Sequence, residues 1–148
     1  MPTYKGKFTP DNPNKYMGDV ENIIYRSGWE RRAMKYFDVN PGVLKWASEE
    51  VAIPYYDSVG KKVRRYFPDF LIKVKNAEGN TQTHLIEVKP SKDLRPPVGG
   101  RGKKKSTVLY EMKTYRMNRD KFAAARKWCD DRNIIWDIWT EKQLKQKG

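Results

Sequence analysis

Two runs of alternating apolar residues, joined by a turn that contains glycine, constrain the fold of this chain more than any other feature. The runs occupy residues 63–75 and 81–90, and the turn between them, Asn76 to Asn80, reads NAEGN. Alternation with a period of two places successive side chains on opposite faces of a strand. The pattern predicts two paired strands that direct one apolar face toward a core: Phe70, Ile72, Val74, Ile86 and Val88.

The length of the turn determines which residues of the two strands face each other. If Asn76 to Asn80 form the turn, Lys75 pairs with Thr81, and the register then places Asp69 opposite Glu87. Directly opposed side chains have Cβ atoms about 4.5–5.5 Å apart, and two carboxylates at that distance repel each other. A divalent cation held between Asp69 and Glu87 would offset the repulsion.

Mg²⁺ is the expected cation, with Mn²⁺ as a substitute, because hard cations take oxygen ligands and Mg²⁺ keeps several waters that substrate phosphates can replace. The backbone carbonyl of Val88 is a further candidate ligand. Lys89 lies on the same face as Glu87, where it would orient or help deprotonate the attacking water, or neutralise charge that develops on a phosphate. The alternative is an exposed polar face on which Glu87 and Lys89 simply form an ion pair.

The charge of the chain indicates a polyanionic partner. Lys and Arg outnumber Asp and Glu by 31 to 18, which gives a formal net charge of +13, and the accompanying nine Tyr, five Phe and five Trp favour a nucleic acid as this partner. Two basic runs are the candidates for contact with DNA phosphates, and the alternative for the second run is a solvated linker. They comprise Lys61, Lys62, Arg64, Arg65, Arg101, Lys103, Lys104 and Lys105.

Several kinds of site are excluded by what the chain lacks. Its single cysteine, Cys129, and its single histidine, His84, exclude an internal disulfide, a cysteine-based zinc cluster and a multi-histidine metal site. We expect Cys129 to be a small core residue, and His84 has the wrong strand parity for the face of Glu87. No run has the length of a membrane helix, and the first residues lack the apolar stretch of a signal peptide. We therefore expect a soluble protein with no membrane partner and no small-molecule cofactor.

The remaining pattern predicts one α/β domain over residues 1–148. We expect an extended N-terminal arm over 1–26, laid on the domain or on a partner, and a flexible basic loop over 91–106 that is rich in Pro, Gly and Lys. The other expected elements are a helix within 27–42 capped by Ser27, a strand in the second half of 43–56 that Pro54 stops, helices over 107–117 and 119–133, a strand over 134–140 and a final helical turn.

The tripeptides PDF, residues 68–70, and EVK, residues 87–89, resemble the motif of the PD-(D/E)xK nuclease superfamily. The longer segments 25–56 and 121–144 are similar to the TnsA-type transposon endonucleases and, more closely, to the head completion nucleases of T-even-type contractile-tailed phages. The similarity extends over nearly the whole chain. It implies a restriction-endonuclease-like core, a mixed central sheet flanked by α-helices.

The resemblance also implies a function: a Mg²⁺-dependent DNA endonuclease that acts in phage head completion and head-tail joining. Portal or neck proteins would then be partners, and the virion or the host cytoplasm during assembly would be the location. A resolvase-, repair- or transposition-type nuclease of the same fold is one alternative. A DNA-binding head-tail connector without catalysis is the other.

Glu30 has two possible roles. The stretch SGWE fits a capping box, in which Ser27 is the N-cap and Glu30 reaches back to its backbone N–H. The resemblance implies instead that Glu30 is the additional acid found in many members of the superfamily, in a metal-site or water-positioning role. Glu49 and Glu50 are interpreted as surface polar residues.

Overall fold

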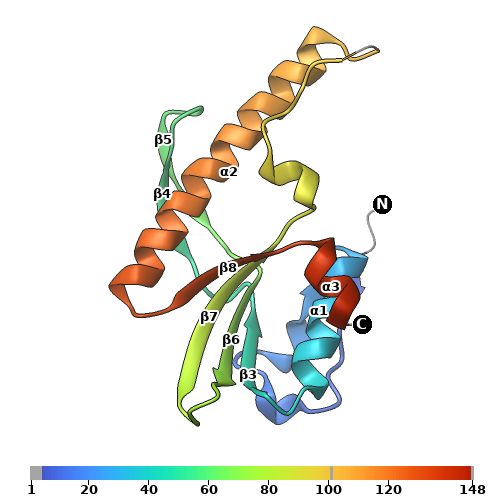
Figure 1. The fold of residues 1–148 in the computed structure, drawn as a ribbon, viewed down its shortest axis with the longest axis vertical. Helices are drawn as coiled ribbons and strands as arrows, with labels where there is room; N and C mark the ends of the chain where they lie inside the picture. The colour runs from blue at the N-terminus through green and yellow to red at the C-terminus, as the bar shows by residue number, and fades with distance from the viewer. Residues whose placement is uncertain (1–4, 101, 148) are drawn as a thin grey trace.

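A four-stranded mixed sheet forms the centre of the protein (Figure 1). The computed structural model describes residues 5–100 and 102–147. The strands lie in the order β3 (Val43–Ser48), β6 (Phe70–Lys75), β7 (Thr81–Val88) and β8 (Ile135–Trp139). The first three are antiparallel neighbours and β8 is parallel to β7. The expected α/β architecture with a mixed sheet flanked by helices is confirmed.

Helices cover both faces of this sheet. α1 (Gly28–Val39) and α3 (Glu141–Lys147) pack on one face. Phe70, Ile72 and Ile86 of the expected apolar face are buried there with Phe37, Trp46 and Leu144, and Val74 and Val88 are partly buried against them. α2 (Lys105–Asp131) covers the other face, where Leu85 packs with Ala125 and Cys129. Asp69 and Glu87 belong to the face that α2 covers.

The paired strands β6 and β7 have the expected register. Lys75 pairs with Thr81 and Phe70 with Ile86, so Asp69, the next residue along, stands opposite Glu87. The turn is held by Asn76, whose Oδ1 accepts hydrogen bonds from the N–H groups of Glu78 and Asn80, while Gly79 has a φ of 82°. Side-chain capping by asparagine and the positive φ that glycine tolerates explain why this local prediction is confirmed.

A second hairpin, which the sequence pattern did not reveal, stands apart from the central sheet. β4 (Ile53–Asp57) and β5 (Lys62–Tyr66) pair only with each other and pack beside α2 through Ile53, Tyr55 and Tyr66 (Figure 1). The expectation that Pro54 stops a strand is wrong. Proline is tolerated within β4 because each strand of this hairpin has one edge without a partner strand in residues 5–100 and 102–147.

The strand expected over 63–75 is divided in two. The chain leaves β5 at Tyr66, passes through Phe67, Pro68 and Asp69, and enters β6 in the other sheet. Pro68 cannot donate to a ladder, which suits a position where the chain changes sheets. Likewise, the first half of the segment 43–56 is itself a strand, β3, whose Trp46 and Ala47 are buried.

The two helices expected over 107–117 and 119–133 form one continuous helix, α2. No glycine or proline separates the two halves, so the backbone hydrogen bonds continue through Asn118. The helix begins at Lys105, and a short 3-10 helix, η3 (Ser91–Leu94), follows β7. The predicted loop is therefore shorter than 91–106. Among the described residues, no helix combines the length and the apolar character that a membrane crossing requires.

The segment before α1 lies against the domain over its described part, residues 5–26. β1 (Gly6–Lys7) pairs with β2 (Ile24–Tyr25), and between them lie the 3-10 helices η1 (Pro13–Lys15) and η2 (Val20–Asn22). Tyr16 and Ile23 are buried in the core. The backbone N–H groups of Asp11 and Asn12 donate to the buried Asp38 carboxylate at 2.8 and 3.0 Å. These contacts attach the segment to α1.

Candidate active site

Asp69 and Glu87 are held at one end of the central sheet by backbone N–H groups of the facing segment. The N–H of Val88 donates to Asp69 Oδ2 at 2.8 Å, and the N–H of Asp69 donates to Glu87 Oε1 at 3.3 Å. Pro68 is fully buried before Asp69, and Phe70 is anchored in the core after it. The two carboxylates are therefore fixed by rigid strands, as a preorganised site requires.

Burial makes the charged forms of both acids costly. Glu87 is only 6% exposed. Loss of hydration raises the pKa of Asp69 well above its usual range, and the negative charges of Glu87 and Glu30 raise it further. Loss of hydration also raises the pKa of Glu87, against the opposing effect of Lys89. Such a pair takes up a proton or a cation readily.

Two cationic side chains and one hydroxyl surround Glu87. Lys89 Nζ lies 3.5 Å from Glu87 Oε2, and the Tyr66 hydroxyl donates to Glu87 Oε1 at 2.7 Å. Lys121, from α2, places its Nζ 5.7 Å from the centre of the Tyr66 ring. Partial burial and the neighbouring Lys89 lower the pKa of Lys121. Three elements, β5, β7 and α2, therefore supply the side chains around this carboxylate.

Tyr66 and Lys121 were missed by the sequence analysis. Tyr66 is the one buried residue of β5, and Lys121 lies four residues before Ala125 on the apolar stripe of α2. A lysine that interrupts an apolar helix stripe is a signal that could have been found. The position of Tyr66 depended on the β4–β5 hairpin, which was not anticipated.

Glu30 makes the contacts of a helix cap and is linked to the two acids by electrostatics. Ser27 Oγ accepts the N–H of Glu30 at 3.1 Å, which confirms the helix cap. Glu30 Oε1 accepts from the N–H of Arg26 at 3.2 Å instead of that of Ser27, so the capping box is shifted by one residue. Burial raises the pKa of Glu30, and the charges of Glu49 and Glu87 add to the effect. Glu30 therefore lies within electrostatic reach of Glu87.

Glu49 lies closer to these acids than the sequence suggested. Its backbone N–H donates to the carbonyl of Asp69 at 3.0 Å, in a left-handed conformation with a φ of 55°. Its carboxylate accepts two bonds from Arg26, at 3.0 and 3.2 Å. Arg26 therefore binds both acids: its guanidinium group donates to Glu49, and its backbone N–H donates to Glu30.

The oxygen atoms of Asp69, Glu87 and Val88 suit a hard cation that retains some of its water ligands. No three Asp, Glu, His or Cys side chains converge on one point in residues 5–100 and 102–147. Asp69 and Glu87 offer carboxylate oxygens, and Val88 offers a backbone carbonyl. Mg²⁺ is bound in many proteins by one or two carboxylates and otherwise by water and phosphate, so this small oxygen set fits it.

The predicted DNA-binding residues lie in two places. Lys61, Lys62, Arg64 and Arg65 are on the β4–β5 hairpin. Arg64 Nε is bound to the buried Asp57 at 2.8 Å, and Arg65 lies 5.6 Å above the Phe67 ring. Arg64 is therefore committed in part to a structural ion pair, whereas Lys61 and Lys62 are exposed without such a partner in the described residues.

The second basic run surrounds the start of α2. Lys103 Nζ pairs with Glu111 at 3.0 Å, Lys104 is the N-cap of α2 and Lys105 is its first residue. All three are exposed, and Arg101 lies outside the described residues. The run is thus carried on the end of a long helix and not on a free loop.

His84 and Cys129 lie where the sequence predicted. His84 points to the face opposite Glu87, and its Nδ1 is 2.8 Å from Asp137 Oδ2. Cys129 is buried in the core beneath α2, where burial raises the pKa of its thiol to about 11. Neither residue contacts Asp69 or Glu87.

The raised pKa values of the acids give the fold a distinctive pH dependence. A carboxyl group with a raised folded pKa contributes stability that is fully present below its unfolded pKa, about 4 for aspartate, and is lost as the pH rises through the folded pKa. In chelator, we expect the melting temperature of the wild type to fall relative to that of Asp69→Asn as the pH rises above about 4. Parallel melting curves for the two proteins over this interval would contradict the assignment.

The chain was compared with known proteins. The model of the TnsA-like endonuclease N-terminal family matches residues 40–141, a region that contains Asp69, Glu87 and Lys89 and begins after Glu30. The head completion nuclease of Enterobacteria phage T4 is 37% identical over 148 residues, which cover 98% of this chain and 96% of that protein. Agreement between a family match over most of the chain and a relative that aligns from end to end shows that the chain belongs to the TnsA-like endonucleases, a nuclease family of the PD-(D/E)xK type.

Proposed function

We propose that this protein is a Mg²⁺-dependent DNA endonuclease that acts in phage head completion. The single observation that carries the proposal is the opposed pair of Asp69 and the buried Glu87 with Lys89 beside it. The name of the phage T4 relative supports the role in head completion. Double-stranded DNA is the substrate, portal or neck proteins are candidate partners, and the virion or the host cytoplasm during assembly is the expected location.

The metal site would be built from Asp69, Glu87 and the carbonyl of Val88. A bound Mg²⁺, or Mn²⁺ in its place, polarises the phosphoryl oxygen and lowers the pKa of a bound water. The chain itself keeps both carboxylates close together despite their repulsion. Tyr66 contributes by donating to Glu87 Oε1, which leaves Oε2 facing Lys89.

Lys89 would act on the reacting groups directly. Its ammonium group, close to Glu87, is placed to orient the attacking water or to neutralise charge that develops on the phosphate. Lys121 adds a second positive charge on the α2 side of the same acid. Lys89 and Lys121 both lower the pKa of Glu87, so in their charged forms both would add positive potential at a phosphate bound beside this acid.

A Glu30→Gln variant separates the two roles of Glu30. Glutamine also serves in a capping box, so the melting temperature should change little. If Glu30 serves the metal site or positions water, we expect a reduced cleavage rate at saturating DNA. Full activity with an unchanged melting temperature would assign Glu30 to the cap alone.

The basic run at the start of α2 is expected to set DNA affinity and not the chemical step. Replacing Lys103, Lys104 and Lys105 by alanine should flatten the slope of log affinity against log salt by about 0.9 for each lost phosphate contact. The cleavage rate at saturating DNA should change little, because only uniform binding is lost.

A matched control for this variant removes three charges elsewhere. Lys35, Lys142 and Lys145 are exposed on α1 and α3, and their replacement by alanine should leave most of the salt slope intact. Equal slopes for the two triple variants would show that the run at α2 is a solvated segment. Normal binding without cleavage would show that it closes over the site.

Incubation of the protein with closed circular and linear duplex DNA, with Mg²⁺ or with chelator, tests the function. We expect Mg²⁺ to be required and the closed circles to be cut, which an exonuclease cannot do. Preferential cleavage of a four-way junction would favour the resolvase-type alternative. Binding of both DNA forms without any cleavage would favour a non-catalytic connector.

A further inference from the structure

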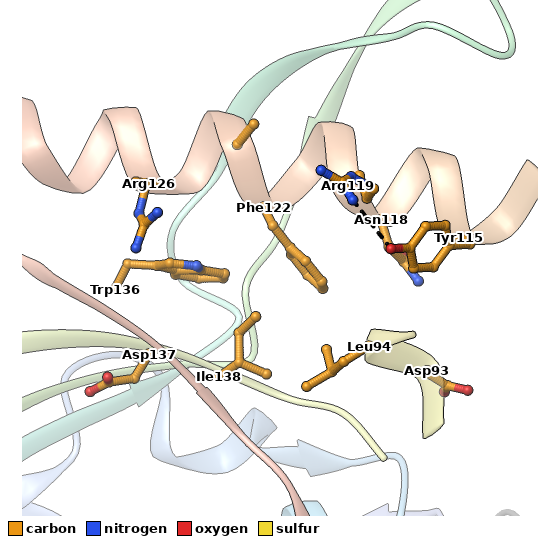
Figure 2. A pocket seen from close by; sticks show the side chains of 11 residues that line it. Asp93, Leu94, Tyr115, Asn118, Arg119, Phe122, Arg126, Trp136, Asp137 and Ile138 are labelled. Carbon is orange, nitrogen blue, oxygen red and sulfur yellow. Dashed lines mark hydrogen bonds between the residues drawn. The ribbon is translucent and has the colours of Figure 1, made fainter. Parts of the chain in front are cut away.

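A hollow of about 580 Å³ lies between α2, η3 and β8 (Figure 2). Figure 2 shows Phe122 pointing into it from α2, Ile138 from β8 and Leu94 from η3. Its volume falls in the range of about 300–1,000 Å³ that is typical of small-ligand pockets. Nothing in the proposed cleavage chemistry uses these residues.

The walls of the hollow combine aromatic rings with guanidinium groups. The ring centres of Phe122 and Trp136 are 5.8 Å apart, and the two ring planes are inclined at 44°. Arg119 Nη1 donates to the Tyr115 hydroxyl at 3.2 Å, and Arg126 lies on the other side of Phe122 (Figure 2). Aromatic faces stack on nucleobases, and guanidinium groups bind phosphates and can also stack.

Asn118 is the residue that points to a ligand. It is 8% exposed and lines the hollow, yet its side-chain amide makes no hydrogen bond to any of the described residues. Trp46 Nε1 is the one side-chain polar atom among the described residues that lacks both solvent and a partner, so the Asn118 amide is open to the solvent of the hollow and can exchange that water for a ligand. The amide offers a donor and an acceptor together, which is the pattern presented by the edge of a nucleobase.

The hollow adjoins the acids through the strand pairing of β7 and β8. Ile138 is the register partner of Glu87, and partners on neighbouring strands lie on the same sheet face about 5 Å apart. The ring centres of Trp136 and Tyr66 are 6.5 Å apart, and the Tyr66 hydroxyl donates to Glu87. A nucleotide that occupies the hollow would therefore lie close to the scissile phosphate.

A second hollow, of about 810 Å³, continues along α2. It shares Tyr115 and Arg119 with the first and is also lined by Lys113 and Arg116. Three basic side chains, Lys113, Arg116 and Arg119, and one acid, Asp120, therefore lie among the otherwise largely apolar residues that line it, and the basic groups can contact the phosphates of a strand that leaves the first hollow. Two carboxylates also line the first hollow: Asp137, which His84 binds, and Asp93, which can accept from the amino group of a base.

We propose that the hollow binds one unpaired nucleobase of the DNA substrate beside the cleavage site, with the base against Phe122 and Trp136 and its edge on the Asn118 amide. The inference rests on the proposed nuclease function and adds a substrate preference to it. DNA that contains an unpaired or easily extruded nucleotide binds better, because removing a base from the stack costs least there.

Binding measured in chelator tests this proposal without any need for cleavage. The probes are a perfectly paired duplex, the same duplex with one bulged nucleotide, and the same bulge with an abasic residue. We expect the wild type to bind the base-containing bulge about tenfold better than either other probe, since stacking of one base supports a difference of that size. Equal affinity for the abasic and base-containing bulges would overturn the proposal.

Two variants and one control assign the effect to the hollow. Asn118→Leu has a similar size but no amide, so we expect it to lose most of the preference while the protein remains folded. Arg126→Gln alters an exposed residue at the rim and should reduce the preference without any risk to folding. Lys127→Gln removes a charge from the same turn of α2 but outside the hollow. This variant should keep the preference for the base-containing bulge.

The outcome is separable from that of the nuclease proposal. A bulge preference that depends on Asn118 supports the hollow even if Mg²⁺ gives no cleavage. Cleavage that requires Mg²⁺, together with a full bulge preference in both the Asn118→Leu and Arg126→Gln variants, would refute the hollow and leave the nuclease intact.

Discussion

Replacement of Asp69 by asparagine is expected to abolish DNA cleavage while the protein remains folded. The change removes one of the two acids that would hold the metal, and metal-ion catalysis contributes several kcal/mol of charge stabilisation in the transition state. A loss of about 4 kcal/mol corresponds to about a 1,000-fold slower reaction. The fold should persist because the amide oxygen can still accept the N–H of Val88.

The same variant should be more stable than the wild type in chelator near neutral pH. Asparagine removes the repulsion between Asp69 and Glu87, both of which have raised pKa values in the folded protein. Cleavage of closed circular DNA and thermal melting are measured on one preparation. Glu78→Gln, in the turn at the far end of the same hairpin, is the matched control and should cleave normally. Wild-type activity in Asp69→Asn would remove Asp69 from the site.

Replacement of Lys89 by methionine is expected to slow cleavage by about 100- to 1,000-fold, the cost of one lost charge-stabilising group in a preorganised site. Methionine keeps the length and the apolar stem of lysine, and Lys89 Nζ contacts only Glu87 in the described residues. Metal binding should survive, since no ligand is removed. This distinguishes Lys89 from Asp69, whose loss should abolish both.

Single-turnover cleavage at saturating Mg²⁺ and DNA measures the effect of Lys89. Lys92→Met, in the exposed η3 turn three residues later, is the control for loss of a nearby positive charge. If the two variants cleave at the same rate, Lys89 has no role beyond its ion pair with Glu87.

The parts of the site that sequence predicted are those set by local geometry. The pairing of Asp69 with Glu87 follows from a short turn and a period of two, and the structure has this register. The cap at Ser27 is similarly local. Such features depend on residues close together in the chain, so one sequence contains the information that fixes them.

The parts that sequence did not predict depend on contacts between distant segments. Tyr66 reaches Glu87 because the β4–β5 hairpin packs on α2, and Lys121 reaches the same acid from the middle of that helix. Arg26 and Glu49 meet only after β3 is placed beside α1. The order of elements does not specify these distances, and a strand pattern cannot show that Pro68 divides two sheets.

Binding of Mn²⁺, followed by the electron paramagnetic resonance signal of the free ion, tests most directly whether the opposed acids form a metal site. We expect the wild type and Lys89→Met to remove Mn²⁺ from solution with similar affinity, and Asp69→Asn to remove little. Increasing Mg²⁺ should release the bound Mn²⁺. Equal Mn²⁺ binding by the wild type and Asp69→Asn would contradict a metal centre at Asp69 and Glu87.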